Sequence, residues 1–139
     1  MRADLKFVTD RFNTFNASVF GGQLPTPQFA IVTARTFAGR FTYRIKRGPL
    51  GTRHAYDPCL RISRCFDMPQ NEIEDIILHE MIHYYIFHKR ITDNAPHGRQ
   101  FRHIMQKINA LHGRNITISA RIDRSTGSTD TRVRQHLIC

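Results

Sequence analysis

The residues best suited to chemistry lie in one pentapeptide, His79-Glu80-Met81-Ile82-His83. Histidines four residues apart project from the same face of a helix, about one turn from each other. This spacing allows both imidazoles to bind one Zn²⁺ ion. The glutamate after the first histidine is placed to take a proton from a zinc-activated water, as a general base does. The pentapeptide therefore predicts a hydrolase with zinc as cofactor and Glu80 as catalytic residue.

The sequence around this motif predicts a buried helix over about residues 69–89. Pro69 suits a first helical turn, and Glu72 lies near the positive end of the expected helix dipole. A helix with such apolar flanks belongs in a core, where two histidines and a carboxylate require a reason. The alternative is a pair of hydrogen-bonded core histidines with a buried ion pair, but the spacing of all three groups favours a metal. The apolar flanking residues are Ile73, Ile76, Ile77, Leu78, Ile82, Tyr84, Tyr85, Ile86 and Phe87.

A catalytic zinc usually has three protein ligands, so a third residue must join the two histidines. No glutamate follows Glu80 in the sequence, which excludes a downstream glutamate ligand of the thermolysin type. The extended metzincin pattern also fails, because Ile86 and Lys89 stand where its glycine and third histidine would be. The candidates that remain are His88, His97, His103, His112 and His136, with Asp93 and Asp123 behind them.

His97 is the favoured third ligand. It follows a proline-containing loop over residues 92–96, and a loop of this length allows a second helix to fold back across the first. Gly98 beside it lets the backbone come close. His88, in contrast, lies roughly 140° around the helix from His83, on the wrong face.

The remaining patterns predict an α+β domain. Apolar residues at helical spacing predict further helices over about residues 3–20 and 97–112. Alternating residues predict short strands. The expected strands lie at residues 29–32, 38–46 and 59–66. We expect a small three- to four-stranded twisted sheet packed on the metal-binding helix and the two further helices. The strand near Leu60 to Arg64 is expected to pair with an extended substrate.

The charge balance favours a polyanionic partner. The formal net charge is +10, and 17 of the 21 basic residues are arginine. Arginine suits bidentate contact with phosphate, and such a balance attracts polyanions whatever their sequence. We therefore expect sequence-independent association with single- or double-stranded DNA, against the simpler alternative of a solvated basic surface. The candidate nucleic-acid contacts are Arg40, Arg44, Arg61 and Arg64.

Composition also indicates the cellular compartment of the protein. No run of 18 apolar residues occurs, so no membrane span is expected. The first ten residues include Asp4, Lys6 and Asp10 and do not read as a signal peptide. We expect a cytoplasmic, DNA-associated protein that is not secreted. The domain is expected to cover residues 1–122, with a loop and tail over residues 123–139.

Together these residues resemble the SprT-like zinc metallopeptidase family. The resemblance implies a zincin-like fold, zinc held by His79, His83 and His97, and Glu80 as general base. It also implies proteolysis of DNA-associated or DNA-crosslinked proteins. Many members continue into a zinc ribbon with paired Cys-x-x-Cys motifs, which this sequence does not contain. The matching stretches are the pentapeptide, His97-Gly98-Arg99-Gln100-Phe101, Phe20-Gly21-Gly22-Gln23-Leu24-Pro25 and Leu60-Arg61-Ile62-Ser63.

The predicted reaction is hydrolysis of peptide bonds, for which a further donor should stabilise the oxyanion. An alternative is a nucleic-acid-binding module with a structural zinc and no turnover. Such a module has no need of Glu80, and a closed structural site needs a fourth protein ligand. A third reading, a metal-dependent amidase acting on small substrates, gains no support from the basic surface. The candidates for oxyanion or substrate contacts are Tyr84, Tyr85, His88 and Arg99.

Overall fold

The computed structural model describes residues 1–118, which form three α-helices, three strands and a short 3₁₀ turn. The order along the chain is α1 (Leu5–Ser18), β1 (Gln28–Val32), β2 (Gly39–Arg47), the 3₁₀ turn (Pro49–Gly51), β3 (Arg53–Ser63), α2 (Gln70–His88) and α3 (Arg99–His112).

The strands form one mixed sheet in the order β1-β3-β2. The central strand, β3, runs parallel to β1 and antiparallel to β2. The β2–β3 pairing is a long hairpin closed by the 3₁₀ turn, and its register shifts between Thr42 and Arg44. Asp57 lies opposite this shift with a φ of 61°. Because β3 is paired on both sides, β2 is an edge strand, and no other strand within residues 1–118 pairs with its free edge.

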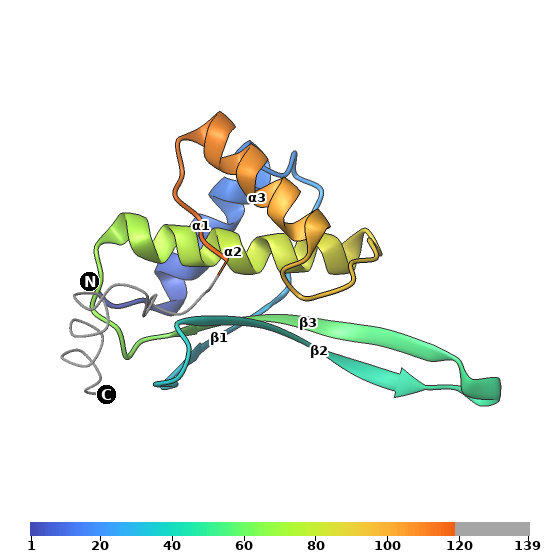
Figure 1. Ribbon diagram of the computed structural model, residues 1–139. Coiled ribbons are helices and arrows are strands. Elements are labelled where there is room, and N and C mark those ends of the chain that lie inside the picture. The colour runs from blue at the N-terminus through green and yellow to red at the C-terminus, as the bar shows by residue number, and fades with distance from the viewer. Residues whose placement is uncertain (119–139) are drawn as a thin grey trace.

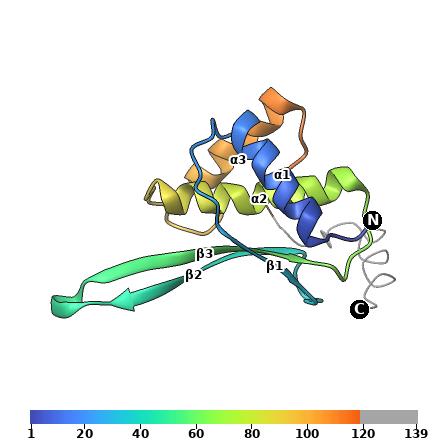
Figure 2. The ribbon, with the colours of Figure 1, turned by 180° about the vertical axis from the view of Figure 1, so that it is seen from behind.

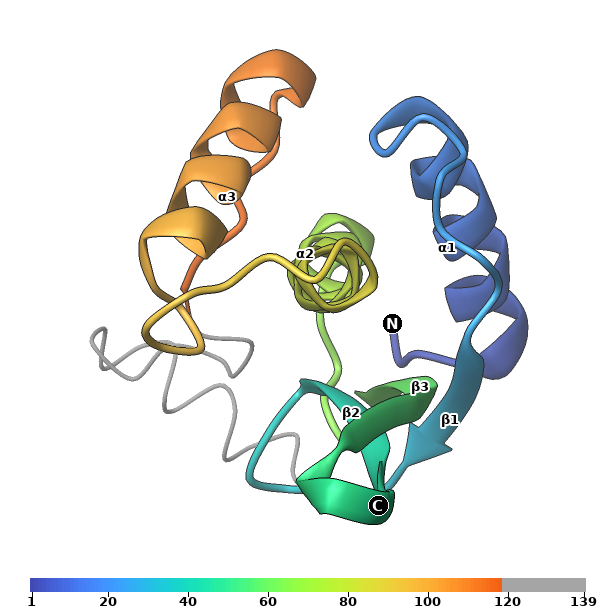
Figure 3. The same cartoon turned by 90° about the vertical axis from the view of Figure 1, so that its right-hand side faces the viewer.

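All three helices cover the same face of the sheet (Figure 1). Seen along its axis, α2 lies between α1 and α3 and above the strands (Figure 3). This position explains why α2 is buried on several sides, with Ile73, Ile77, Leu78 and Met81 almost inaccessible to water. The outer part of the β2–β3 hairpin extends beyond the helices, as the view from behind also shows (Figure 2).

The helix boundaries follow from local sequence. The Asp4 side chain accepts a hydrogen bond from the Phe7 N–H at 2.7 Å and caps the start of α1. Phe12 and Phe15 face the core from that helix. Gly113 ends α3 in the left-handed conformation, which a glycine adopts without steric cost.

These observations confirm the predicted α+β class, with a three-stranded sheet and two helices beside the metal-binding helix. The prediction that the strand near Leu60 to Arg64 pairs with a substrate is wrong, because that segment lies in the central strand. The third strand also begins at Arg53, earlier than expected, because the irregular register near Asp57 hides its alternation.

No helix within residues 1–118 is long and apolar enough to cross a membrane. The predicted domain boundary at residue 122 and the tail beyond it lie outside the described residues.

Candidate metal centre

Two of the predicted ligands come from the middle of α2. His79 and Glu80 are each 2% exposed, and His83 is half-buried one turn later. The imidazole centroids of His79 and His83 lie 5.0 Å apart. The helix thus holds both rings side by side at the depth of the core, as the four-residue spacing predicts.

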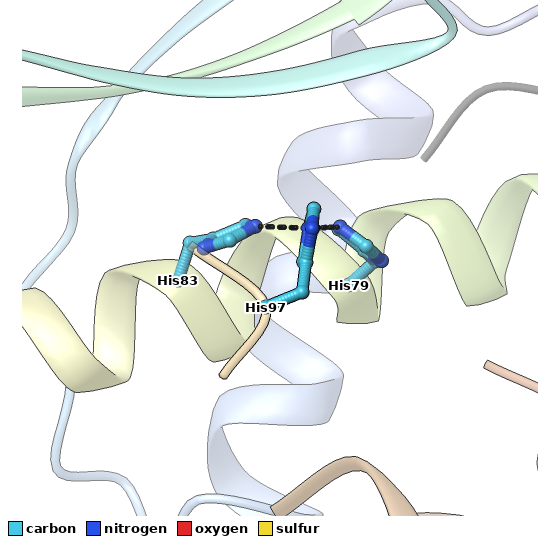
Figure 4. A group of neighbouring side chains, drawn as sticks. All are labelled: His79, His83 and His97. Atoms are coloured by element: carbon cyan, nitrogen blue, oxygen red, sulfur yellow. Dashed lines mark hydrogen bonds between the residues drawn. The ribbon is translucent and has the colours of Figure 1, made fainter. Parts of the chain in front are cut away.

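The third histidine reaches the same point from the loop before α3. The Nε2 atom of His97 lies 3.1 Å from Nε2 of His79 and 3.1 Å from Nε2 of His83 (Figure 4). The carboxylate of Asp93 fixes this loop by accepting hydrogen bonds from the N–H groups of Asn94 and Phe101. A Cβ at position 98 would lie only 2.3 Å from Asp93 Oδ1, so any larger residue there would displace the Asp93 side chain.

Two further contacts orient the imidazoles. Phe101, fully buried on the first turn of α3, packs against all three rings at centroid distances of 4.8, 4.6 and 4.8 Å. The Nδ1 atom of His79 lies 2.7 Å from the carbonyl oxygen of Thr117. Because a carbonyl only accepts, Nδ1 carries the proton and Nε2 presents a lone pair toward the other histidines.

The surroundings keep the three imidazoles neutral. Burial, and then the neighbouring His83, lowers the pKa of His79 to about 3, although the Thr117 carbonyl opposes this. Burial and the neighbouring His97 lower the pKa of His83 to about 4. Burial and the charge of Arg102 also lower the pKa of His97. Neutral imidazole is the form that binds metal ions.

The three nitrogens fit a metal ion. Ligand atoms of His79, His83 and His97 all lie within 4.8 Å of one another. Nitrogens bound ~2.0–2.1 Å from a tetrahedral Zn²⁺ lie ~3.4 Å apart, close to the two Nε2 separations found here. Neutral imidazoles that face each other through Nε2 cannot all satisfy one another by hydrogen bonds, because each ring donates only once. A cation at this point resolves that conflict.

Glu80 lies beside this cluster rather than within it. Its Oε2 is 3.9 Å from Nε2 of His79 and has no hydrogen-bond partner among the described residues. Burial raises the pKa of Glu80 to about 8, opposed by a hydrogen bond from the Phe41 backbone and by the charge of Arg40. A cation among the histidines would favour the ionised carboxylate. The geometry thus leaves one carboxylate oxygen available for proton transfer.

An open cleft of about 1270 Å³ leads to these groups. One wall is formed by β2 through Gly39, Phe41 and Tyr43, and the opposite wall by the loop containing Pro96 and His97. The free edge of β2 therefore borders the three histidines and Glu80. An extended peptide is the shape that such an edge accepts.

The four residues predicted as oxyanion or substrate contacts do not line this cleft. Tyr84 is buried among aromatic rings and donates its hydroxyl hydrogen to the Pro25 carbonyl at 2.7 Å. Tyr85 packs against Phe20, and His88 is exposed near the end of α2. Arg99 is exposed at the start of α3, beside a separate shallow pocket.

Only one of the four predicted nucleic-acid contacts lines the cleft. Arg40 lies over the Phe37 ring at the cleft, 4.1 Å from its centroid. Arg44 and Arg61 stand on β2 and β3, where Arg61 donates to the Thr42 hydroxyl. Arg64 is exposed just after β3. Arg40 thus lines the cleft, although its register partner on β3 is Arg61, which does not.

Of the other ligand candidates, His103 and His112 are exposed on α3, and His136 and Asp123 lie outside the described residues. The sequence interpretation also missed two positions that shape the centre. The Thr117 carbonyl carries no side-chain signal. Gly39 lets β2 approach α2, and only its place at the start of a strand could have drawn attention to it.

Comparison with known proteins gives one consistent family. The SprT-like family model matches residues 8–122. The chain is 37% identical over 112 residues to the DNA-dependent metalloprotease dvc-1 of Caenorhabditis elegans, covering 77% of this chain and 29% of that protein. It is 34% identical over 109 residues to the DNA-dependent metalloprotease SPRTN of Homo sapiens, covering 77% and 21%. The chain thus spans less than a third of these curated relatives. No solved structure matches it.

Proposed function

The chain belongs to the SprT-like family, and we propose that it is a zinc-dependent endopeptidase acting on DNA-associated or DNA-crosslinked proteins. The observation that carries the proposal is the convergence of three neutral imidazoles on one point beside a buried carboxylate oxygen that has no hydrogen-bond partner within residues 1–118. We further propose that the arrangement is zincin-like and that residues 1–122 form the catalytic domain, acting in the cytoplasm at DNA.

The proposed ligands of the zinc ion are the Nε2 atoms of His79, His83 and His97. A zinc ion held there would activate a water molecule and polarise the scissile carbonyl group. The Thr117 carbonyl keeps the His79 ring in the tautomer that presents Nε2. Phe101 packs against all three rings and restricts their orientation.

Glu80 is the proposed general base. Its Oε2 accepts a proton from the attacking water and then delivers it to the leaving amine nitrogen. The hydrogen bond from the Phe41 backbone holds the carboxylate in place, while Oε2 has no partner in the described part of the chain. Burial removes competing solvent, so the proton remains between substrate and carboxylate.

The proposed substrate site is the cleft along the free edge of β2. An extended peptide paired with this edge passes the three histidines, and its side chains contact apolar groups of the walls such as Phe41 and Phe87. The strand proposed to pair with the substrate is therefore β2, and not the segment near Leu60 to Arg64 that the sequence suggested.

The proposal of DNA-linked substrates is supported by the names of the relatives and by the net charge of +10. Cationic surface attracts DNA by a salt-dependent, sequence-independent term. We expect affinity for DNA to fall steeply as the salt concentration rises.

The test is cleavage of an unstructured protein by the zinc-loaded wild type and by Glu80→Gln. The variant keeps the shape of the side chain and removes the base. We expect it to retain zinc and to lose about 10²- to 10⁴-fold in rate, the contribution typical of general base catalysis. Cleavage by Glu80→Gln at the wild-type rate would exclude the assigned role. Loss of zinc would mean that Glu80 is needed to form the centre.

A further inference from the structure

The outer part of the β2–β3 hairpin serves no visible purpose in the core. Every residue from 43 to 56 is exposed. The end of the hairpin extends beyond the helices (Figure 1). A two-stranded ribbon alone is only marginally stable in water, and its free edges invite unwanted pairing. A binding role would explain why the protein keeps a ribbon with these disadvantages.

The two faces of the ribbon carry different side chains. Residues paired across antiparallel strands share a face. On β2, Phe41 and Tyr43 contact Phe87 of α2, so Ile45 and Arg47 belong to the same, helix-side face. The residues between them point to the opposite side, which we call the outer face. Through the observed register, the outer face comprises Arg44 paired with Tyr56 and Lys46 paired with His54.

The outer face combines cations with aromatic rings. Arg44 and Lys46 supply two positive charges, and the nearby Asp57 carboxylate lies 3.4 Å from Arg44 in a solvent-exposed ion pair of small energetic weight. The rings of His54 and Tyr56 are nearly parallel, with an interplanar angle of 8° and centroids 6.1 Å apart. Arg61 continues the same face toward the core of the sheet.

We propose that this outer face binds single-stranded DNA, with phosphates on Arg44 and Lys46 and a base stacked on the ring pair. Stacking of bases on aromatic side chains beside a cationic track is the way proteins hold single strands without regard to sequence. A duplex hides the faces of its bases, so the exposed rings favour an unpaired strand. The inference rests on the proposed action at DNA and assigns a surface to it.

The position of the ribbon fits this role. The inner end of β2, from Gly39 to Tyr43, forms a wall of the cleft, and the outer face begins at the next residue. A strand of DNA on the outer face therefore lies close to the cleft without entering it. A protein attached to that strand is thereby kept near the three histidines.

The test measures binding of fluorescent oligothymidine by anisotropy, using zinc-loaded Glu80→Gln protein so that cleavage does not interfere. The outer variant is Arg44→Ala with Lys46→Ala. The matched control is Arg47→Ala with Arg53→Ala, a cross-strand pair on the helix-side face that removes the same charge. We expect the outer variant to bind about 10- to 100-fold more weakly at about 50 mM salt, with a salt slope smaller by about 1.4. Equal weakening by both variants would overturn the assignment to one face.

A second variant tests the ring pair without changing charge. Tyr56→Leu should weaken binding of the single strand by about 5-fold or more, the effect of losing one stacked base. Unchanged binding, or tighter binding of a duplex of the same length, would overturn the proposal. Cleavage of an unstructured protein by otherwise wild-type hairpin variants keeps the two questions apart. If the hairpin variants cleave normally and bind DNA as tightly as the wild type, only this inference is refuted. If the wild type shows no cleavage that depends on Glu80, only the proposed enzyme activity is refuted.

Discussion

Gly39→Ala should impair catalysis while leaving the metal ligands untouched. Gly39 is the first residue of β2 and is buried against α2. A Cβ there would lie 2.8 Å from Cγ2 of Ile76 and 3.1 Å from both Cγ and Oε2 of Glu80. Carbon atoms in contact prefer about 3.5–4.0 Å, so the strand or the glutamate must move by roughly 0.5–1 Å.

A displacement of that size at a catalytic group costs up to about 100-fold in rate, so we expect kcat/KM to fall about 10- to 100-fold. Overpacking should lower the free energy of unfolding by about 1–3 kcal/mol. Zinc content should stay at the wild-type level, because no ligand atom is contacted. Peptide cleavage, zinc content and urea denaturation measure the three effects separately.

Gly48→Ala is the matched control, because its added Cβ would lie 2.4 Å from Thr52 Oγ1 at the tip of the hairpin, far from the cleft. It should cost stability without reducing peptide cleavage. Adding Ile76→Ala to Gly39→Ala relieves one contact but not the contact with Glu80, so activity should stay low. Peptide cleavage by Gly39→Ala within twofold of the wild-type rate would refute the dependence of Glu80 on this close approach.

The remaining predictions concern stability. Removing metal with a chelator should lower the melting temperature of the wild type, since a ligand present at 1,000 times its Kd stabilises by about 4 kcal/mol; an unchanged melting temperature would contradict a metal centre. Arg114 lies 2.8 Å from Asp75 and 3.2 Å from Glu74, so Arg114→Ala should cost about 1–3 kcal/mol near neutral pH. Burial raises the pKa of Glu74, but hydrogen bonds from its partners outweigh it and lower that pKa below 4.5. The stability this gives is present above pH 4.5 and is lost as the pH falls, so urea denaturation should show a smaller cost at pH 3; an equal cost would contradict the ion pair. Tyr84→Phe should lower the free energy of unfolding by about 1 kcal/mol and leave kcat/KM unchanged, because the Tyr84 hydroxyl donates to the Pro25 carbonyl. A large loss of kcat/KM would instead indicate that Tyr84 takes part in catalysis.

The local features of the centre could be predicted from the sequence. His79 and His83 are four residues apart, and helical geometry alone brings such residues together. His97 was favoured over the other candidate ligands because of the loop before it and the glycine beside it. Asp93 fixes the loop that carries His97 and leaves no room for a Cβ at Gly98, and that small residue was visible in the sequence.

The features that depend on distant pairing could not be predicted. The order of the strands is set by contacts between segments far apart in sequence, so the central place of Leu60 and the free edge of β2 were hidden. The Thr117 carbonyl acts through the backbone, which has no residue signature. Tyr84 has the chemistry of an oxyanion donor, but the packing of Phe12 and Phe41 directs it into the core.

The most direct test of the central claim is X-ray absorption at the zinc edge on the zinc-loaded protein. The account predicts three histidine nitrogens and one oxygen from water around the metal, with the fourth position open to substrate. A fourth protein ligand would contradict it and favour the alternative of a nucleic-acid-binding module with a structural zinc. Fewer than three histidine nitrogens would contradict the proposed three-histidine centre.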